Sequence, residues 1–425
     1  MSAIEGVPGG LEIEESKAIA KILEEAGVDL FHVSQGTYVS VDMILPPSVM
    51  PKACFIDNAA EIKKVVSVPV IGVGKITEPY VAEAILESGK ADLVTMARAS
   101  LADPALPNKA RNGECADIIR CIGCLQDCTG QLGINGSVRC LVNPMTGMEW
   151  KYDLTTLPAN MQKTVYVAGG GVAGCSAAIA AAKKGHRVTL YEQKSELGGQ
   201  WKLAAVPIGK SDFASLIAWQ NRQLKKLNVN VVLGKELTAD IILKESPDAV
   251  IVATGSTPIR PNFAGSETLP VYTAHEMLEG NIAFGNNIVV VGGGLVGAET
   301  ADLLAEHGSH VTIIELQPVI VKDGEPTPTK YLLKRLQKNQ VDIYTSAKVI
   351  KLDTDKVYYE QSDCEKVIEN VDQLVLAVGV KSNAVLADEI KQKGYDGKIV
   401  IVGDAAKVRN GYLDIQEGFE AGLEI

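Results

Sequence analysis

Four cysteines, Cys121, Cys124, Cys128 and Cys140, have the spacing C-x2-C-x3-C-x11-C. Three of them fall within eight residues, where ordinary disulfides are strained because near neighbours place their Cβ atoms at the wrong separation. Three close thiolates followed by a fourth after a loop suit a single inorganic group. Thiolates select zinc or iron–sulfur clusters, and four thiolates ligate a 4Fe–4S cluster. The spacing therefore predicts a four-cysteine metal site.

Two other interpretations of these cysteines compete with an iron–sulfur cluster. A structural four-cysteine zinc site usually has two C-x2-C pairs, whereas this segment has one. A disulfide framework is typical of short secreted chains, whereas this chain has 425 residues and 8 cysteines. Both comparisons favour the cluster. We interpret the remaining, scattered cysteines as ordinary buried small residues: Cys54, Cys115, Cys175 and Cys364.

A glycine-rich turn follows an apolar strand in TVYVAGGGVAGCSAAIAAAKKGHRVTLYEQ, residues 164–193. Gly169, Gly171 and Gly174 fit the pattern G-x-G-x-x-G, and Glu192 ends the next strand. Such glycines allow a tight turn and the close approach of a pyrophosphate, which the helix N-terminus binds, while the acid accepts from ribose hydroxyls. The segment predicts a dinucleotide-binding unit.

A second turn of the same kind lies in NNIVVVGGGLVGAETADLLAEHGSHVTIIELQ, residues 286–317. Gly292, Gly294 and Gly297 fill the glycine positions, and Glu315 ends the second strand. A carboxylate there accepts from a free 2′-hydroxyl and repels a 2′-phosphate. Neither of the next two residues is an arginine. This turn is therefore expected to prefer NADH to NADPH.

Helices and strands alternate before the cysteines as well. Helical patterns cover residues 11–29, 57–67 and 78–90, and short apolar segments cover 30–34, 68–74 and 91–98. Apolar strands that each follow a helix indicate a parallel sheet covered on both faces. The connector 149–163 then leads to α/β units that begin at Thr164 and Asn287. The fold class is α/β.

Bulk properties limit the partners. The length indicates two to four domains. A net charge of −11 argues against nucleic acid, since binding phosphates requires clustered Lys and Arg. No apolar run reaches the ~18 residues that span a bilayer, so no membrane partner is expected. The thiols indicate a reduced, cytoplasmic setting. The oligomeric state stays open, and a homo-oligomer is one possibility.

The two turns together resemble the flavoproteins that bind two dinucleotides. Supporting motifs are ELGGQ (196–200), VATGS (252–256), LAVGVKSN (376–383) and IVGDAA (401–406). The resemblance implies that the first turn holds FAD and the second the nicotinamide nucleotide. It also assigns FAD contacts within these motifs, at Gly199, Gln200, Thr254, Gly255, Gly403 and Asp404.

The order of barrel segment, cysteines, FAD unit and NAD unit resembles the iron–sulfur members of the old yellow enzyme family. That family includes 2,4-dienoyl-CoA reductase, enoate reductases, bile-acid enoate reductases and trimethylamine dehydrogenase. The resemblance implies the last part of an FMN-binding TIM barrel over 1–112, an iron–sulfur segment over 113–160, an FAD domain over 161–280 and 386–425, and an NAD(H) domain over 281–385.

In the family, FMN lies at the C-terminal face of the barrel. The pairs Gly74–Lys75 and Ala97–Arg98 resemble its phosphate-binding turns, although GVGKI and MARAS also suit ordinary strand ends. Only three of the eight barrel strands are expected here, so the FMN site is expected to be incomplete. Tyr38 aligns where some members have a proton donor, although a tyrosine packed on the barrel rim is the simpler interpretation. His32 is interpreted as a core or rim residue.

The resemblance implies an NADH-dependent oxidoreductase in which electrons pass from NADH through FAD and a 4Fe–4S cluster to FMN. The substrate is then a small molecule with an activated C=C bond, such as an enoate, an enoyl-CoA or a steroid enone. Two alternatives stay open: an NADH–FAD–iron–sulfur module that serves a partner protein, as in the small subunit of glutamate synthase, or an inactive fragment. The sequence does not identify the substrate.

Overall fold

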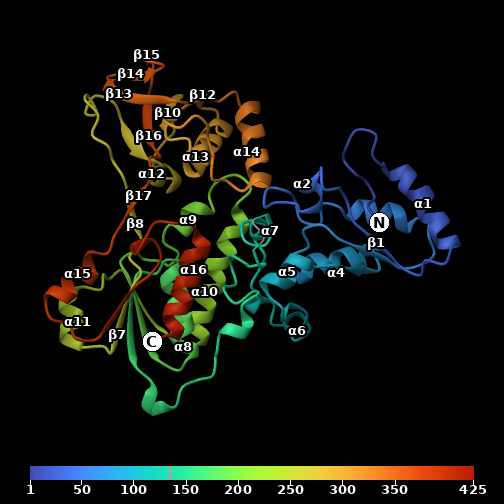
Figure 1. Cartoon of the computed structure of the whole chain (residues 1–425), viewed down its shortest axis with the longest axis horizontal. Helices are drawn as coiled ribbons and strands as arrows, with labels where there is room; N and C mark the ends of the chain where they lie inside the picture. The colour runs from blue at the N-terminus through green and yellow to red at the C-terminus, as the bar shows by residue number, and fades with distance from the viewer. Residues whose placement is uncertain (134–135) are drawn as a thin grey trace. The chain divides into compact units, whose positions relative to one another are not determined.

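The computed structural model describes residues 1–133 and 136–425, and the chain folds as two compact units, Met1–Tyr152 and Asp153–Ile425 (Figure 1). Both units are α/β, as the sequence predicts. The division between them falls within the range 113–160 that the sequence assigns to the cysteine segment and connector. In the part of the chain that the structure describes, no helix has the length and apolar character needed to cross a membrane.

The first unit is built on three parallel strands in the order β1–β2–β3. They are β1 (Phe31–Val33), β2 (Val70–Gly72) and β3 (Leu93–Val94). Ser2 also forms a parallel bridge with Ser34, so the first residues run beside β1. The three strands predicted before the cysteines are confirmed, and each is shorter than its apolar run. Helices of this unit are α1 (Ile13–Glu25), α2 (Val41–Ile44), α3 (Ile56–Lys63), α4 (Pro79–Glu87), α5 (Ala97–Ala102), α6 (Leu106–Arg111) and α7 (Thr129–Gly133).

Local signals set the ends of α1. The backbone N–H of Glu12 donates to the Glu15 carboxylate at 3.0 Å, which satisfies one free donor at the helix start. Gly27 follows the helix with φ +98°, a left-handed conformation that glycine adopts without a Cβ penalty. The buried face of α1 then joins the core between the helices and the sheet, where Ile62 and Val70 are fully buried.

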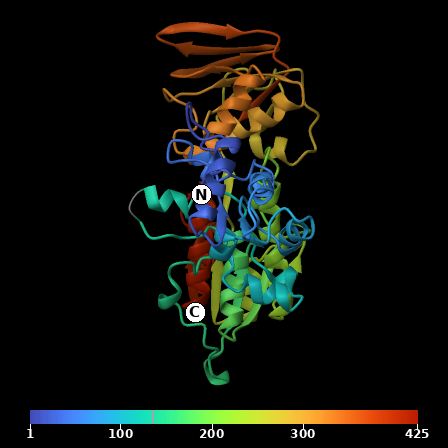
Figure 2. The ribbon, with the colours of Figure 1, turned by 90° about the vertical axis from the view of Figure 1, so that its right-hand side faces the viewer.

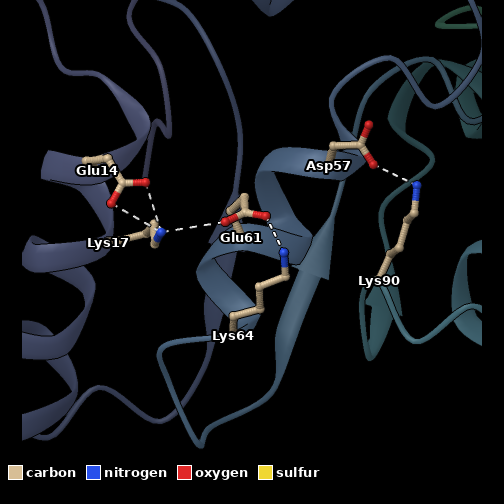
Figure 3. Close-up of polar contacts among 6 residues, drawn as sticks. All are labelled: Glu14, Lys17, Asp57, Glu61, Lys64 and Lys90. Carbon is tan, nitrogen blue, oxygen red and sulfur yellow. Dashed lines mark hydrogen bonds and ion pairs between the residues drawn. The ribbon is translucent and has the colours of Figure 1, made fainter.

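Ion pairs connect the exposed faces of the helices in this unit (Figure 3). Lys17 of α1 lies between Glu14, at 2.9 Å, and Glu61 of α3, at 3.5 Å. Lys90, which follows α4, pairs with Asp57 of α3 at 2.6 Å. Exposed pairs of this kind contribute little net stability, so burial of apolar side chains holds this unit together.

The first sheet of the second unit has five parallel strands in the order β18–β7–β4–β5–β6. Their bounds are β4 (Thr164–Ala168), β5 (Arg187–Glu192), β6 (Asn230–Leu233), β7 (Ala249–Val252) and β18 (Lys398–Ile401). One face packs on α8 (Val172–Lys183), α10 (Ala214–Lys226) and α16 (Gly411–Leu423). The other packs on α11 (Ala239–Glu245) and α15 (Val385–Gln392). Helices on both faces of a parallel sheet make this a doubly wound fold.

The second sheet repeats this plan in the order β12–β11–β10–β16–β9. Its strands are β9 (Val271–Thr273), β10 (Asn287–Val291), β11 (His310–Ile314), β12 (Asp342–Tyr344) and β16 (Gln373–Leu376). Helices α12 (Ala274–Leu278), α13 (Leu295–Glu306) and α14 (Pro326–Lys338) cover one face. The other face packs on an antiparallel sheet, seen as a separate layer in Figure 2: β13 (Ala347–Asp353), β14 (Lys356–Gln361) and β15 (Cys364–Ile368).

Three features differ from the sequence-based expectations. Strand β9 lies inside the range 161–280 assigned to the FAD domain, yet it pairs with β16 of the second sheet. The antiparallel layer was not foreseen, because its alternating pattern resembles a polar surface as much as a strand. Cys115 and Cys364 are exposed, so the expectation that all scattered cysteines are buried is wrong for these two.

Candidate functional site

The four cysteines of the C-x2-C-x3-C-x11-C segment line one pocket of the first unit. The rest of its lining is apolar except for one cation: Arg98, Leu101, Ile122, Gly123, Leu125, Leu141 and Val142. A cysteine-lined cavity with apolar walls excludes water from whatever the thiols bind. The structure thus brings together the four residues that the sequence singled out.

Helix α5 and the turn after it form hydrogen bonds with the chain just before Cys121 and just after Cys140. Asp103 is only 3% exposed, and its carboxylate accepts from the Ile119 N–H at 2.9 Å and from Lys109 Nζ at 2.6 Å. On the far side of the pocket, Asn143 Nδ2 donates to the Ala102 carbonyl at 2.9 Å. The chain before Cys121 and after Cys140 is therefore fixed to one support, independently of any bound group.

The four cysteines are partly exposed as whole residues, and desolvation raises the pKa of three of their thiols, Cys121, Cys124 and Cys140. Burial, together with the charges of Cys121 and Cys128, raises the pKa of Cys140 to about 12. Burial also raises the pKa of Cys121, while Arg98 and Lys75 act in the opposite direction. Metal ligands must be thiolates. Ionisation of Cys121, Cys124 and Cys140 is therefore favoured by a strong positive charge in the pocket.

The separation of the thiols bears on the kind of metal. A tetrahedral zinc ion with Zn–S bonds of about 2.3 Å requires sulfur atoms about 3.8 Å apart. Across residues 1–133 and 136–425, no three His, Cys, Asp or Glu side chains gather closely enough to hold one metal ion. A 4Fe–4S cluster binds each thiolate to a different iron, so it accepts ligands that are farther apart. Four cysteine thiols are the donor set that a 4Fe–4S cluster takes.

The candidate FMN-phosphate residues lie in the same unit. Lys75 is 7% exposed with φ +50°, a left-handed conformation that is rare for a side chain of this size. Its Nζ donates to the carbonyls of Ser48 and Met50, the latter at 2.6 Å. Arg98 Nη1 donates to the Pro46 carbonyl at 2.9 Å. Gly74 precedes Lys75 with φ +124°, and Ala97 begins α5.

Tyr38 and His32 are both exposed in the first unit. Tyr38 lies in a turn after β1 and is 94% exposed, so it neither packs on a rim nor occupies a pocket. His32 is exposed on β1 between the buried residues Phe31 and Val33, so it is not a core residue. Burial lowers the pKa of His32, with the N-terminal ammonium acting in the same direction.

The glycines of the first turn have two different functions. A Cβ on Gly169 would lie 2.3 Å from the Ala253 carbonyl, and one on Gly174 would clash with the Gly169 carbonyl at 1.9 Å. These two are therefore required for packing of the strand against α8. A Cβ on Gly171 would meet no atom within 4 Å, and Gly171 caps α8 without a side-chain hydrogen bond. The open space and free N–H donors fit a pyrophosphate.

The acidic residue is tied to the turn. Glu192 accepts from the Gly170 N–H and from the Lys194 N–H, both at 2.8 Å. A Cβ on Gly170 would lie 2.3 Å from Leu197 Cδ2 and 3.1 Å from the Glu192 carboxylate. The middle glycine of GGG is thus needed for the acid to reach the turn. Sequence reasoning missed Gly170, although the repeated GGG triplet was the signal.

The other candidate FAD residues collect at the carboxyl edge of the first sheet. Gln200 Nε2 donates to Ser256 Oγ at 2.9 Å, and that hydroxyl donates to Asp404 Oδ2 at 2.9 Å. Thr254 Oγ1 donates to the Asn383 carbonyl. Three glycines with positive φ complete the set: Gly199, which lies against Gly171, together with Gly255 and Gly403. Ligands of open α/β sheets bind at this edge.

The second turn repeats the first closely. A Cβ on Gly292 or on Gly297 would clash with backbone carbonyls, at 2.4 and 1.9 Å, whereas one on Gly294 would meet nothing within 4 Å. Glu315 accepts from the Gly293 and Gln317 N–H groups. Its carboxylate is therefore fixed at the end of β11, where the sequence places the discrimination between the two nicotinamide nucleotides.

Asp414 is a further acidic residue at the first site. Its Oδ1 lies 3.3 Å from the position of a Cβ on Gly403 and is a buried atom without a hydrogen-bond partner. Burial, together with the charges of Asp404 and Glu417 and against that of Arg409, raises the pKa of Asp414 to about 7. The sequence offered no signal for this residue, since a carboxylate on a helix face is usually solvated.

Comparison with known proteins agrees with this arrangement. Residues 163–406 match the pyridine nucleotide-disulphide oxidoreductase family, and residues 1–116 match the NADH:flavin oxidoreductase / NADH oxidase family. The chain is 39% identical to an NADH oxidase of Thermoanaerobacter brockii, covering all of this chain and 66% of that protein. It is 37% identical to a bilirubin reductase of Mediterraneibacter gnavus, covering 95% of this chain and 64% of that protein.

Among solved structures, the complex of a 2-naphthoyl-CoA reductase with 2-naphthoyl-CoA superimposes with a TM-score of 0.94 at 30% identity. The match covers all of this chain and 64% of that one. The chain therefore spans about two thirds of the length of the proteins it resembles. The α/β fold predicted from the sequence, with a barrel segment before two dinucleotide-binding units, is confirmed.

Replacement of Gly171 tests the first turn. Because Gly171 has φ −71° and open space around its Cβ position, Gly171→Ala should fold with the thermal stability of the parent chain. The added methyl group should weaken FAD binding by about tenfold or more, since it occupies the place of the pyrophosphate. Flavin fluorescence on release measures the affinity. Unchanged FAD affinity in a folded variant would refute the assignment.

Asp414 predicts a pH dependence of stability. Its pKa in the folded state is about 7, above the ordinary value of 3.8, so its stabilising contribution is complete below about pH 4 and is lost as the pH rises through 7. Asp414→Asn should remove a slope of about 1.4 kcal/mol per pH unit from this window. Urea unfolding of the second unit between pH 4 and 8 measures the slope, with Asp240→Asn, an exposed carboxylate, as the control. A slope retained in Asp414→Asn contradicts the shifted pKa.

Proposed function

The chain belongs to the NADH:flavin oxidoreductase / NADH oxidase family and carries a pyridine nucleotide-disulphide oxidoreductase domain, and on this premise we propose that it is an NADH-dependent flavin and iron–sulfur oxidoreductase. When bound, FAD would supply the hydride acceptor for NADH, a 4Fe–4S cluster would supply single-electron transfer, and FMN would supply the hydride donor to an activated C=C bond. The observation that carries this proposal is the single apolar pocket lined by four cysteines, in a chain with two complete glycine-rich turns.

The first unit provides the cluster site and part of an FMN site. Cys121, Cys124, Cys128 and Cys140 are the proposed ligands, and the apolar lining excludes water from them. Gly74, Lys75, Ala97 and Arg98 are the proposed contacts of the FMN phosphate, where the two cations oppose the phosphate charge. Arg98 also lines the cysteine pocket, so its positive charge lies near both the proposed cluster site and the proposed FMN-phosphate site.

The second unit provides the two dinucleotide sites. The open space at Gly171 and the uncapped N-terminus of α8 are proposed to bind the FAD pyrophosphate. Glu192 accepts from ribose hydroxyls, and Asp404, held by Ser256, binds the ribityl region. The corresponding features at Gly294 and Glu315 are proposed to bind NADH.

The substrate is proposed to be a small molecule with a conjugated C=C bond. Two of the named relatives are reductases of bilirubin and of 2-naphthoyl-CoA, and both molecules contain conjugated carbon–carbon double bonds. The barrel-like segment 1–116 favours this reading over a bare electron-transfer module, which would not need an FMN-binding unit.

Cys124→Ser tests the proposed electron path. Because Cys124 lies in the first unit and the FAD residues lie in the second, the variant should lose the cluster while retaining FAD and its reduction by NADH. Iron and sulfide analysis, EPR at low temperature and flavin content measure the three properties. Full retention of iron, or parallel loss of FAD, would contradict the assignment of ligands.

Glu315 tests the choice of nucleotide. Glu315→Gln keeps an acceptor for the Gly293 N–H and removes the charge that repels a 2′-phosphate, so the preference for NADH should narrow by about tenfold, or about 1.4 kcal/mol. Glu315→Arg should reverse it. Stopped-flow reduction of bound FAD by each nucleotide gives the ratio. Equal rates with NADH and NADPH in the parent chain would show that Glu315 does not discriminate.

A further inference from the structure

The segment Pro46–Ala53 lies between α2 and α3, and we call it the strap. Its backbone carbonyls accept hydrogen bonds from both cationic side chains proposed to bind the FMN phosphate. Arg98 Nη1 donates to the Pro46 carbonyl at 2.9 Å, and Lys75 Nζ donates to the Met50 carbonyl at 2.6 Å. Pro46 and Pro47 are buried although they belong to no helix or strand. A buried loop whose carbonyls are paired with buried or half-buried cations is a fixed part of the structure rather than a surface connection.

The strap also contacts the cysteine loop directly. The Ser48 N–H donates to the carbonyl of Gly123, between Cys121 and Cys124, at 2.9 Å. Gly123 has φ +65°, and a Cβ on it would lie 3.0 Å from both the Cα and the N of Ser48. The backbone of Gly123 thus packs directly against the backbone of Ser48, so no flexible side chain could move aside for an added Cβ. This contact requires glycine for its conformation and for its lack of a side chain.

A second connection runs through a buried carboxylate. Glu78 is only 3% exposed, and its two oxygens accept from Lys52 Nζ at 2.6 Å and from Arg120 Nη1 at 3.0 Å. Lys52 belongs to the strap, and Arg120 is the residue before Cys121. Removal of one partner from such a buried group leaves the others uncompensated. Glu78 therefore couples the position of the strap to that of the first cysteine.

We propose that the strap is the positioning element of the four-cysteine pocket, acting through Gly123 and through the Lys52–Glu78–Arg120 connection. The inference rests on the proposed function and deepens it, since the same segment binds Lys75 and Arg98 and so makes the cluster site and the FMN-phosphate site one rigid piece. Groups outside the ligand shell that fix ligand orientation typically change metal affinity about 10- to 100-fold when they are lost. Gly123 and Glu78 are positioning residues in this sense.

Alkylation of the metal-free chain tests the proposal without requiring a cluster. Gly123→Ala should increase the rates at which Cys121 and Cys124 react with iodoacetamide, as measured by mass spectrometry, because the added Cβ pushes the loop from Ser48. Gly113→Ala is the matched control: Gly113 lies in the same unit with φ +75°, but its Cβ would meet nothing within 4 Å. Both variants bear the same conformational penalty, and only one disturbs the strap.

Glu78→Gln supplies a second variant that keeps the side-chain size. Asp92→Asn, which removes a carboxylate paired with Lys63 on the same unit, is its control. After anaerobic reconstitution with iron and sulfide, Gly123→Ala and Glu78→Gln should release iron to a chelator about 10- to 100-fold faster than the parent chain and alter the EPR line shape of the reduced cluster. The FAD content should not change.

The outcomes separate the two claims. Alkylation and iron release like those of the controls, in both Gly123→Ala and Glu78→Gln, would overturn the role of the strap while leaving the proposed function intact. A parent chain that binds no iron would overturn the cluster assignment, whereas faster alkylation of Cys121 and Cys124 in these variants would still support the role of the strap.

Discussion

Burial of four thiols in one apolar pocket is the constraint on which the chemistry of this chain depends. Desolvation raises the pKa of Cys121, Cys124 and Cys140, so a strongly positive group among them is needed to favour their thiolates. Arg98 and Lys75 oppose this effect at Cys121 but are also bound to backbone carbonyls. In the proposed cluster, iron would supply the missing charge, and the surrounding backbone holds the four cysteines around one pocket without it.

The second constraint acts in the two dinucleotide-binding turns, where backbone segments of the protein lie too close together for a Cβ atom. In each turn the first and third glycines are required by the protein itself, and only the second faces open space. The carboxylate at the end of the following strand is bound by the middle amide of GGG, so the acid and the turn form one preorganised unit. Two copies of this unit differ mainly in what covers the second face of the sheet, helices in one and an antiparallel layer in the other.

Much of this was accessible from the sequence because each signal was local. The cysteine spacing, the glycine patterns and the acids at Glu192 and Glu315 all lie within one strand–turn–helix segment or one loop. The contacts that hold the site were not accessible, since they join distant residues: Glu78 with Arg120, Ser48 with Gly123, and Asp414 with Gly403. The exposure of Tyr38 was not accessible either, because only the fold reveals it.

The most direct test of the account is an anaerobic titration of the 425-residue chain with NADH, followed by visible absorbance and EPR, together with analysis of iron, sulfide and zinc. The account predicts a 4Fe–4S cluster whose EPR signal appears as NADH is added and FAD is reduced. Stoichiometric zinc without iron, or complete FAD reduction with no EPR signal from a cluster that is present, would contradict it.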